Sequence, residues 1–183
     1  MPLSVMEEVL DQLESHWVHQ LRPRLDGLTD EEYLWEPVAD CWSVRPRTQV
    51  PEAVAHGSGA YVWEHGPTAG REPLTTIAWR IGHLAEGLAA TAGTFFGGPS
   101  VDLDSYDYAG TATTALAQLD DEYAGFVAGV RALGDVGLSE PQGDRSPPAY
   151  AQAPVARVVM YTAVEVFHHG AEACLLRDLF LRR

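Results

Sequence analysis

Four stretches of the 183-residue chain repeat apolar residues with helical spacing, and this periodicity constrains the fold more than any other feature. Apolar side chains every three or four residues form one stripe along a helix, and that stripe must be buried against other elements. The predicted long helices cover about residues 5–28, 76–96, 113–133 and 154–180. No stretch shows a convincing strand pattern. The chain therefore predicts an all-α fold, a four-helix bundle in a single domain over residues 1–183.

Residues that favour helix ends or breaks refine these boundaries. Pro23 interrupts the first stretch and predicts a kink just before it. Thr29-Asp-Glu-Glu32 has the pattern of a capping box, which predicts an additional short helix. Thr75 or Thr76 suits the N-cap of the second long helix. Pro154 fits the first turn of the last one.

Residues 37–74 are rich in proline and glycine, which predicts a long irregular loop between the first and second long helices. Loops of this length in compact proteins are usually functional or mobile. The part over residues 44–73 carries aromatic residues together with His56 and His65, and it leads directly into the second long helix. We therefore expect it to cover part of the mouth of a site.

Charge narrows the classes of partner. The chain has 12 basic against 26 acidic residues, a net charge of −14, so its surface repels phosphate backbones and anionic lipid. Neither nucleic acid nor a membrane is an expected partner, and no run of about 18 apolar residues predicts a membrane span. The first residues lack the features of a signal peptide. Cys41 and Cys174 are therefore expected to be free thiols, and the expected compartment is the cytoplasm.

Glu165 and His169 are the strongest chemical signal in the sequence. Residues four apart on a helix lie on the same face. His169 falls near the centre of the apolar stripe of its helix, Glu165 lies at the edge of that stripe, and His168 points away from the core. A further candidate ligand, His83, lies on a different predicted helix. Two nitrogens, one oxygen and an open position are typical of a catalytic transition-metal site.

Other interpretations of the same residues stay open on spacing alone. A Glu–His pair four apart also occurs on helix surfaces, and a single histidine beside an apolar stripe is often a hydrogen-bonded core residue. Glu86 and Glu172 each follow a candidate histidine by three residues, so each either orients that imidazole or forms an ordinary surface pair. The chain has no nucleophile elbow, phosphate-binding loop or Cys-x-x-Cys motif.

Several segments, in their order and spacing, resemble the DinB/YfiT-like superfamily. They are Leu28-Thr-Asp-Glu-Glu-Tyr-Leu-Trp-Glu-Pro37, Trp42-Ser43, Thr76-Ile-Ala-Trp-Arg-Ile-Gly-His83-Leu, Glu165-Val-Phe-His-His-Gly-Ala-Glu172 and Leu176-Arg-Asp-Leu179. The resemblance implies a four-helix bundle in up-down-down-up order. It also implies a divalent ion, often zinc or nickel, held by His83, Glu165 and His169. Many members have histidine at position 165, whereas the mycothiol-dependent maleylpyruvate isomerases have glutamate there.

The resemblance also implies a reaction. Characterised relatives use a low-molecular-weight thiol, so the expected function is a metal-dependent S-transferase or isomerase of the mycothiol or bacillithiol type. Its partners would be a small-molecule thiol and an electrophile. A metal-dependent hydrolase and a non-catalytic metal-binding stress-response protein are the alternatives. A homodimer is expected as well, with His16 and Trp17 on the first helix as a candidate surface.

Overall fold

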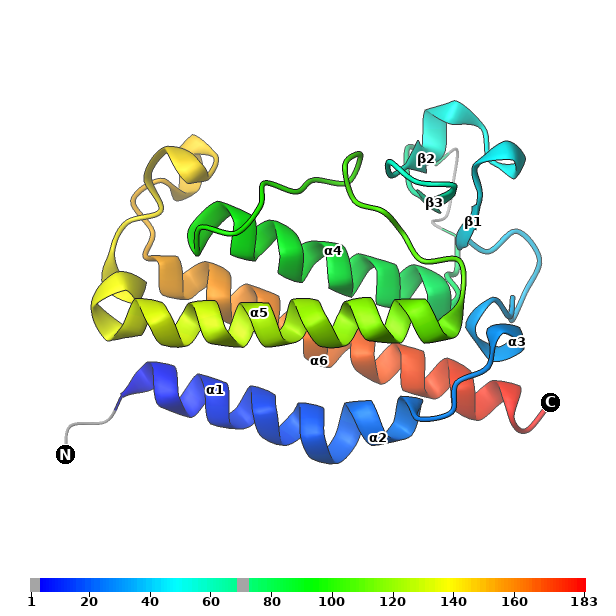
Figure 1. The fold of residues 1–183 in the computed structure, drawn as a ribbon, viewed down its shortest axis with the longest axis horizontal. Helices are drawn as coiled ribbons and strands as arrows, with labels where there is room; N and C mark the ends of the chain where they lie inside the picture. Colours follow the sequence, from blue (N-terminus) through cyan, green and yellow to red (C-terminus); the bar gives the residue numbers. More distant parts are fainter. Residues whose placement is uncertain (1–3, 69–72) are drawn as a thin grey trace.

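The computed structural model describes residues 4–68 and 73–183, and it is mostly helical, as predicted. Four long helical segments lie side by side (Figure 1). The first is one continuous rod made of α1 (Val5–His16), a π-helical segment η1 (Trp17–Leu21) and α2 (Arg22–Leu25). The others are α4 (Ile77–Phe95), α5 (Ala112–Ser139) and α6 (Val155–Phe180), and the short α3 (Asp30–Tyr33) follows the first rod.

Side-chain pairs across the helices define their relative directions. The first rod and α6 run the same way, whereas α4 and α5 run the opposite way (Figure 1). The pairs are Glu14–Arg131 and Arg22–Asp120 between the first rod and α5, His16–Phe167 and Arg24–Asp178 between that rod and α6, and His83–Glu165 and Thr91–Thr162 between α4 and α6.

The apolar stripes of these helices meet in one core. Its most deeply buried side chains include Leu13, Ile81, Phe126 and Val166. Trp17 belongs to this core, because it is 8% exposed and stacks on Tyr123 with 3.7 Å between ring centroids. The expectation that Trp17 lies on a surface for self-association is therefore wrong, since burial within its own chain removes it from that surface.

Two of the long helices contain irregular turns. In the first rod the amide of Arg22 bonds to the carbonyl of Trp17, five residues back. The predicted break before Pro23 is thus a π-helical turn, which takes up a register change next to a residue that lacks an amide proton. In α5, Gly134 has φ 58°, and the helix resumes beyond it to Ser139. The predicted end near residue 133 is this kink.

The segment before α4 contains a small antiparallel sheet, so the prediction of an irregular loop without strands is wrong there. Its strands are β1 (Val44–Pro46), β2 (Ala55–His56) and β3 (Tyr61–Glu64), in the order β1-β3-β2. Trp63 is the central pairing partner, opposite Val44 on one side and His56 on the other. The strands have two to four residues, and adjacent residues of β3 are both buried, so they show no alternation.

The start of α4 lies next to this sheet (Figure 1). Hydrogen bonds cap it and join it to Ser43, the residue before β1. The Thr76 side chain accepts from the amide of Trp79, which confirms Thr76 as the N-cap, and its hydroxyl lies 2.8 Å from that of Ser43.

The capping box at Thr29, which starts α3, is likewise confirmed. Pro154 is the N-cap of α6 rather than a residue of its first turn. No helix in the described part of the chain is both long and apolar enough to span a membrane.

Candidate metal centre

His83 from α4 and Glu165 and His169 from α6 converge where the two helices face each other. The ligand atoms of the three side chains all lie within 4.8 Å of one another. Oε2 of Glu165 is 3.0 Å from Nε2 of His169 and 3.5 Å from Nε2 of His83. The two imidazole rings meet edge to face, with 4.8 Å between centroids. The structure thus brings together all three residues that the sequence selected.

His169 is oriented by a second carboxylate. Its Nδ1 lies 2.7 Å from Oε2 of Glu172 and 2.9 Å from Nη1 of Arg80, and that same Arg80 nitrogen is 3.0 Å from Glu172. When Glu172 accepts hydrogen bonds from both Nδ1–H and Arg80, the lone pair of the imidazole is on Nε2, which faces Glu165. The hypothesis that Glu172 orients His169 agrees with this geometry. Arg80 was not singled out from the sequence, although it lies one turn before His83.

His83 is oriented by aromatic rings instead of a hydrogen bond. Its imidazole stacks near Trp79 at 5.4 Å and near Trp63 at 5.8 Å, with an interplanar angle of 11° to the latter. Nδ1 of His83 is buried and has no hydrogen-bond partner among the described residues. The hypothesis that Glu86 orients this ring is therefore wrong, because Nδ1 has no partner in the described part of the chain and Nε2 faces Glu165.

Trp63 and Trp79, the aromatic wall beside His83, connect the small sheet to the centre. Nε1 of Trp63 donates to the carbonyl of Trp79 at 3.1 Å, and Nε1 of Trp79 donates to the carbonyl of Glu64 at 2.8 Å. These bonds hold β3 against the first turns of α4, next to His83. The segment over residues 44–73, which the sequence suggested as a cover, thus forms a wall of the centre next to His83. Residues 69–72 of that segment lie outside the described residues.

The protonation states suit metal binding. Burial, the neighbouring imidazole of His169 and the positive charge of Arg80 lower the pKa of His83, which favours the neutral ring that a metal requires. Burial alone would raise the pKa of Glu165. Its hydrogen bond with Tyr161 and its contacts with His169 and His83 outweigh burial, and the pKa is lowered. Glu165 is therefore an ionised donor at neutral pH.

A hollow of about 270 Å³ opens beside the three residues, between α4 and α6. His83 and Glu165 line one part of it. The remaining wall is mostly apolar and includes Leu84, Leu88, Val158 and Val166, with Tyr161 at the rim. Tyr161 precedes Glu165 by four residues, so the helical period that selected His169 would also have selected it. The centre thus adjoins an apolar space that a small molecule can enter.

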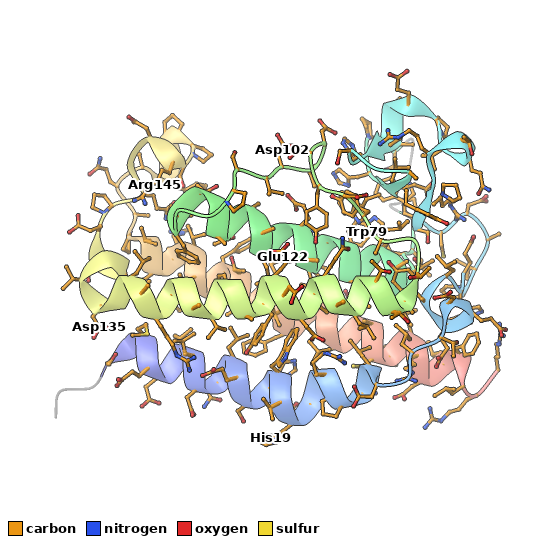
Figure 2. All side chains as sticks on the ribbon, viewed as in Figure 1. His19, Trp79, Asp102, Glu122, Asp135 and Arg145 are labelled. Carbon is orange, nitrogen blue, oxygen red and sulfur yellow. The ribbon has the colours of Figure 1, made fainter. Side chains whose placement is uncertain are left out.

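The other histidines do not contribute to this cluster. His168 has a side chain 61% exposed against 11% for His169, which confirms that His169 is the inward one of the pair. His168, His169 and Glu172 form a second group of donors, but Arg80 already pairs with Glu172. His19 points outward from the first rod (Figure 2), whereas His16, which the sequence suggested for a dimer surface, is partly buried against Phe167 of its own chain.

The remaining candidates have structural partners. His56 lies 2.8 Å from Asp104, and His65 stacks on Trp63 at 5.0 Å. Cys41 and Cys174 are both free and buried, and burial raises the pKa of each thiol. A raised pKa opposes thiolate formation, so neither cysteine is prepared for nucleophilic chemistry.

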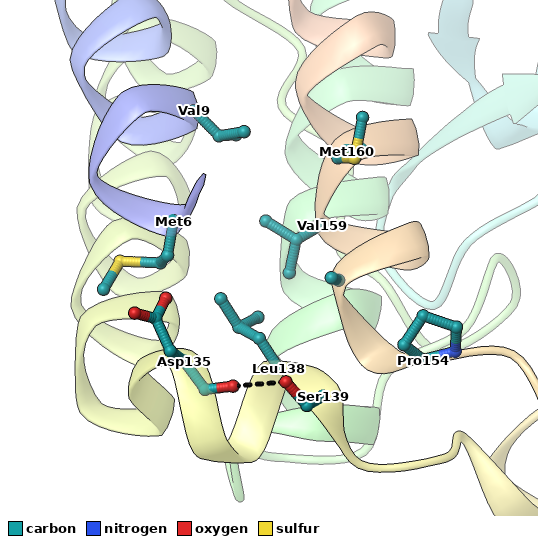
Figure 3. A pocket seen from close by; sticks show the side chains of 9 residues that line it. Met6, Val9, Asp135, Leu138, Ser139, Pro154, Val159 and Met160 are labelled. Carbon is teal, nitrogen blue, oxygen red and sulfur yellow. Dashed lines mark hydrogen bonds between the residues drawn. The ribbon is translucent and has the colours of Figure 1, made fainter. Parts of the chain in front are cut away.

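A second hollow, of about 410 Å³, lies where α1 and α6 begin and α5 ends (Figure 3). Its walls are apolar, from residues such as Met6, Val9 and Met160. Asp135 is its one titratable lining residue, and the hydroxyl of Ser4 donates to that carboxylate at 3.1 Å. This hollow therefore lacks the convergent donors found between α4 and α6.

The donor set between α4 and α6 passes a chemical test for a divalent transition metal. Two imidazoles and one carboxylate are common ligands of such ions, and their Nε2 and Oε2 atoms face a common point beside an open space. The fold and this cluster together define a mostly helical protein with a candidate His-Glu-His metal centre. The chain belongs to the DinB superfamily, whose family profile matches residues 12–173. No curated protein and no solved structure matches it.

Proposed function

We propose that the protein is a divalent-metal-dependent enzyme that uses a low-molecular-weight thiol, an S-transferase or isomerase, with His83, Glu165 and His169 as its metal ligands. The observation that carries this proposal is the convergence of three donors, two of them oriented by neighbours, beside an apolar hollow. Zinc or nickel suits this donor set. A bound divalent ion would supply a Lewis acid that lowers the pKa of a thiol at the open position.

The side chains around the centre perform the remaining tasks. Glu165 contributes one negative charge, so the three ligands leave a divalent ion with a net charge of +1, which favours a thiolate over a neutral ligand. Glu172 and Arg80 keep Nε2 of His169 directed inward. The apolar wall of the hollow excludes water from the space in which an electrophile would meet the sulfur. Tyr161, hydrogen-bonded to Glu165, lies at the rim of that space.

The same proposal includes the finer features of topology, assembly and location. The directions of the four long helices support a four-helix bundle in up-down-down-up order. A homodimer and a cytoplasmic location remain proposals, and the burial of Trp17 means that a dimer would use a surface without it.

The test is a screen of the zinc- and nickel-loaded protein with several cellular thiols against a model electrophile. We expect metal-dependent thiol consumption that rises with pH and is lost in Glu165→Ala, while His168→Ala retains it. Equal turnover without any thiol would favour a hydrolase instead. Absence of turnover with thiols and with hydrolysable esters would favour a non-catalytic metal-binding protein.

A further inference from the structure

Arg157 differs from every other arginine that the structure describes. The chain has 26 acidic against 12 basic residues, and each other described arginine bonds to a carboxylate or a backbone carbonyl. The guanidinium of Arg157 has no hydrogen bond or ion pair in the described residues. Its guanidinium lies over the ring of Tyr150, 5.0 Å from the centroid. A free arginine in so acidic a protein is available for an anion from outside.

Arg157 lines a hollow that contains no acidic side chain. The hollow measures about 500 Å³, and its other lining residues are Gln142, Ser146, Tyr150, Val158 and Tyr161. The neighbouring Arg145, labelled in Figure 2, is engaged elsewhere. Its Nε donates to the carbonyl of Gln142, and its guanidinium lies over the ring of Phe95. The first turn of α6 also carries no acidic residue. The electrostatic environment of Arg157 therefore favours an anion.

This polar hollow adjoins the hollow of the candidate metal centre. Val158 and Tyr161 line both, so the two follow one another along α6. Eight residues separate Arg157 from Glu165, which corresponds to about 12 Å along a helix. The space thus has donors for a metal at one end, an apolar middle and a free guanidinium at the other end.

We propose that this groove binds an elongated anionic molecule, whose metal-directed group lies at His83, Glu165 and His169 and whose carboxylate or phosphate lies at Arg157. The inference rests on the proposed function for the metal-directed end, and it assigns the substrate class of that site. Arg157 acts as a specificity-determining residue in it. The guanidinium offers paired donors to two anion oxygens, and the Tyr150 ring holds it in place.

The experiment uses thiols of defined length with the zinc-loaded protein and measures affinity by calorimetry. The first, 8-mercaptooctanoate, has a length that matches the groove; 8-mercaptooctanol has the same length without the charge; 3-mercaptopropionate has the charge but is too short. We expect 8-mercaptooctanoate to bind about five to ten times more tightly than 8-mercaptooctanol. That advantage should disappear in Arg157→Gln. It should persist in the control variant Arg182→Gln, because Arg182 pairs with Asp178 near the end of α6 and does not line the groove. Arg157→Gln should leave 3-mercaptopropionate unaffected.

The outcomes separate this inference from the proposed function. If the thiols bind in a zinc-dependent manner but Arg157→Gln changes none of their affinities, the groove inference is overturned and the proposed function stands. If no thiol binds in a zinc-dependent manner, the thiol function fails, and octanoate titrated into the metal-free protein then decides the inference. Octanoate binding that weakens in Arg157→Gln supports it. No such dependence overturns it.

Discussion

Glu165 on α6 and Glu86 on α4 are both shielded from solvent at least in part, yet their surroundings differ. Glu165 faces α4 from α6 and has contacts with Tyr161, His83 and His169, which lower its pKa in spite of burial. Glu86, on α4 itself, is 7% exposed, and its carboxylate has no hydrogen bond or ion pair among the described residues. Burial, and then the negative charge of Asp102 on the connection to α5 (Figure 2), raises the pKa of Glu86 to about 7.

The comparison shows that partners, and not burial alone, determine what a shielded carboxylate can do. Glu165 is ionised and surrounded by imidazole nitrogens, so it is prepared for a cation. Besides Asp102, the hydroxyls of Tyr106 and Tyr108 are in the electrostatic environment of Glu86, and neither hydroxyl has a hydrogen-bond partner among the described residues. We therefore interpret Glu165 as a functional group and Glu86 as a group that lowers stability when it ionises.

The largest expected difference between Glu165 and Glu86 is in how their variants respond to zinc in thermal unfolding. Zinc at about 100 times its dissociation constant should stabilise the wild type by about 2.7 kcal/mol, which raises the unfolding midpoint by roughly 5–10 °C in a protein of this size. Glu165→Gln should lose most of that increase, whereas Glu86→Gln should keep it. Thermal unfolding with and without zinc measures both. An equal response of the two variants would remove the distinction between the carboxylates.

The second difference is in the pH dependence of stability. The folded-state pKa of Glu86 is raised to about 7, above its ordinary value of 4.5. The protonated side chain therefore supports the fold at low pH, and this contribution is lost as pH rises from about 4.5 through 7. Glu86→Gln should remove that loss and be more stable than the wild type at pH 8, by about 1–3 kcal/mol. Urea unfolding of the metal-free proteins at several pH values tests this. Parallel profiles for the two proteins would show that Glu86 has a partner.

The smallest difference concerns the tyrosines near Glu86. The hydroxyl of Tyr108 is buried and has no partner in the part of the chain that the structure describes, so Tyr108→Phe should change stability by less than about 0.5 kcal/mol or increase it slightly. Tyr33→Phe is the matched control, because the Tyr33 hydroxyl donates to the carbonyl of Ala109 at 2.8 Å in a buried position. Its loss should cost about 1–3 kcal/mol. A similar cost at Tyr108 would reveal a hydrogen bond there, and the contrast with Glu165 would weaken.

Helical periodicity explains why much of this arrangement was predictable. It located the long helices, because the buried face of each helix appears in the sequence as apolar residues three or four positions apart. It also placed Glu165 and His169 on the inward side of α6. The same spacing contained Tyr161 and Arg80, each one turn from a candidate ligand. Those two were missed because a helix position shows which residues share a face, but not which atoms on a facing helix they meet.

The sheet and the environment of Glu86 could not be predicted from the sequence, for a different reason. Strands of two to four residues carry too few positions for alternation to appear, and β3 pairs with strands on both sides of it. The stacking of Trp63 on His83 depends on that pairing and on contacts between distant segments. The position of Glu86 three residues after His83 left open whether it orients the imidazole or forms a surface pair, and the structure shows neither, because Glu86 is buried and Nδ1 of His83 has no partner among the described residues.

The central claim is that His83, Glu165 and His169 form one metal site, and metal content tests it most directly. Wild type, His169→Ala and His168→Ala would be purified, loaded with zinc, dialysed and analysed by elemental analysis. We predict about one zinc per chain for the wild type and for His168→Ala, and little for His169→Ala, because only the inward histidine faces Glu165. Equal zinc content in the wild type and His169→Ala would contradict the assignment.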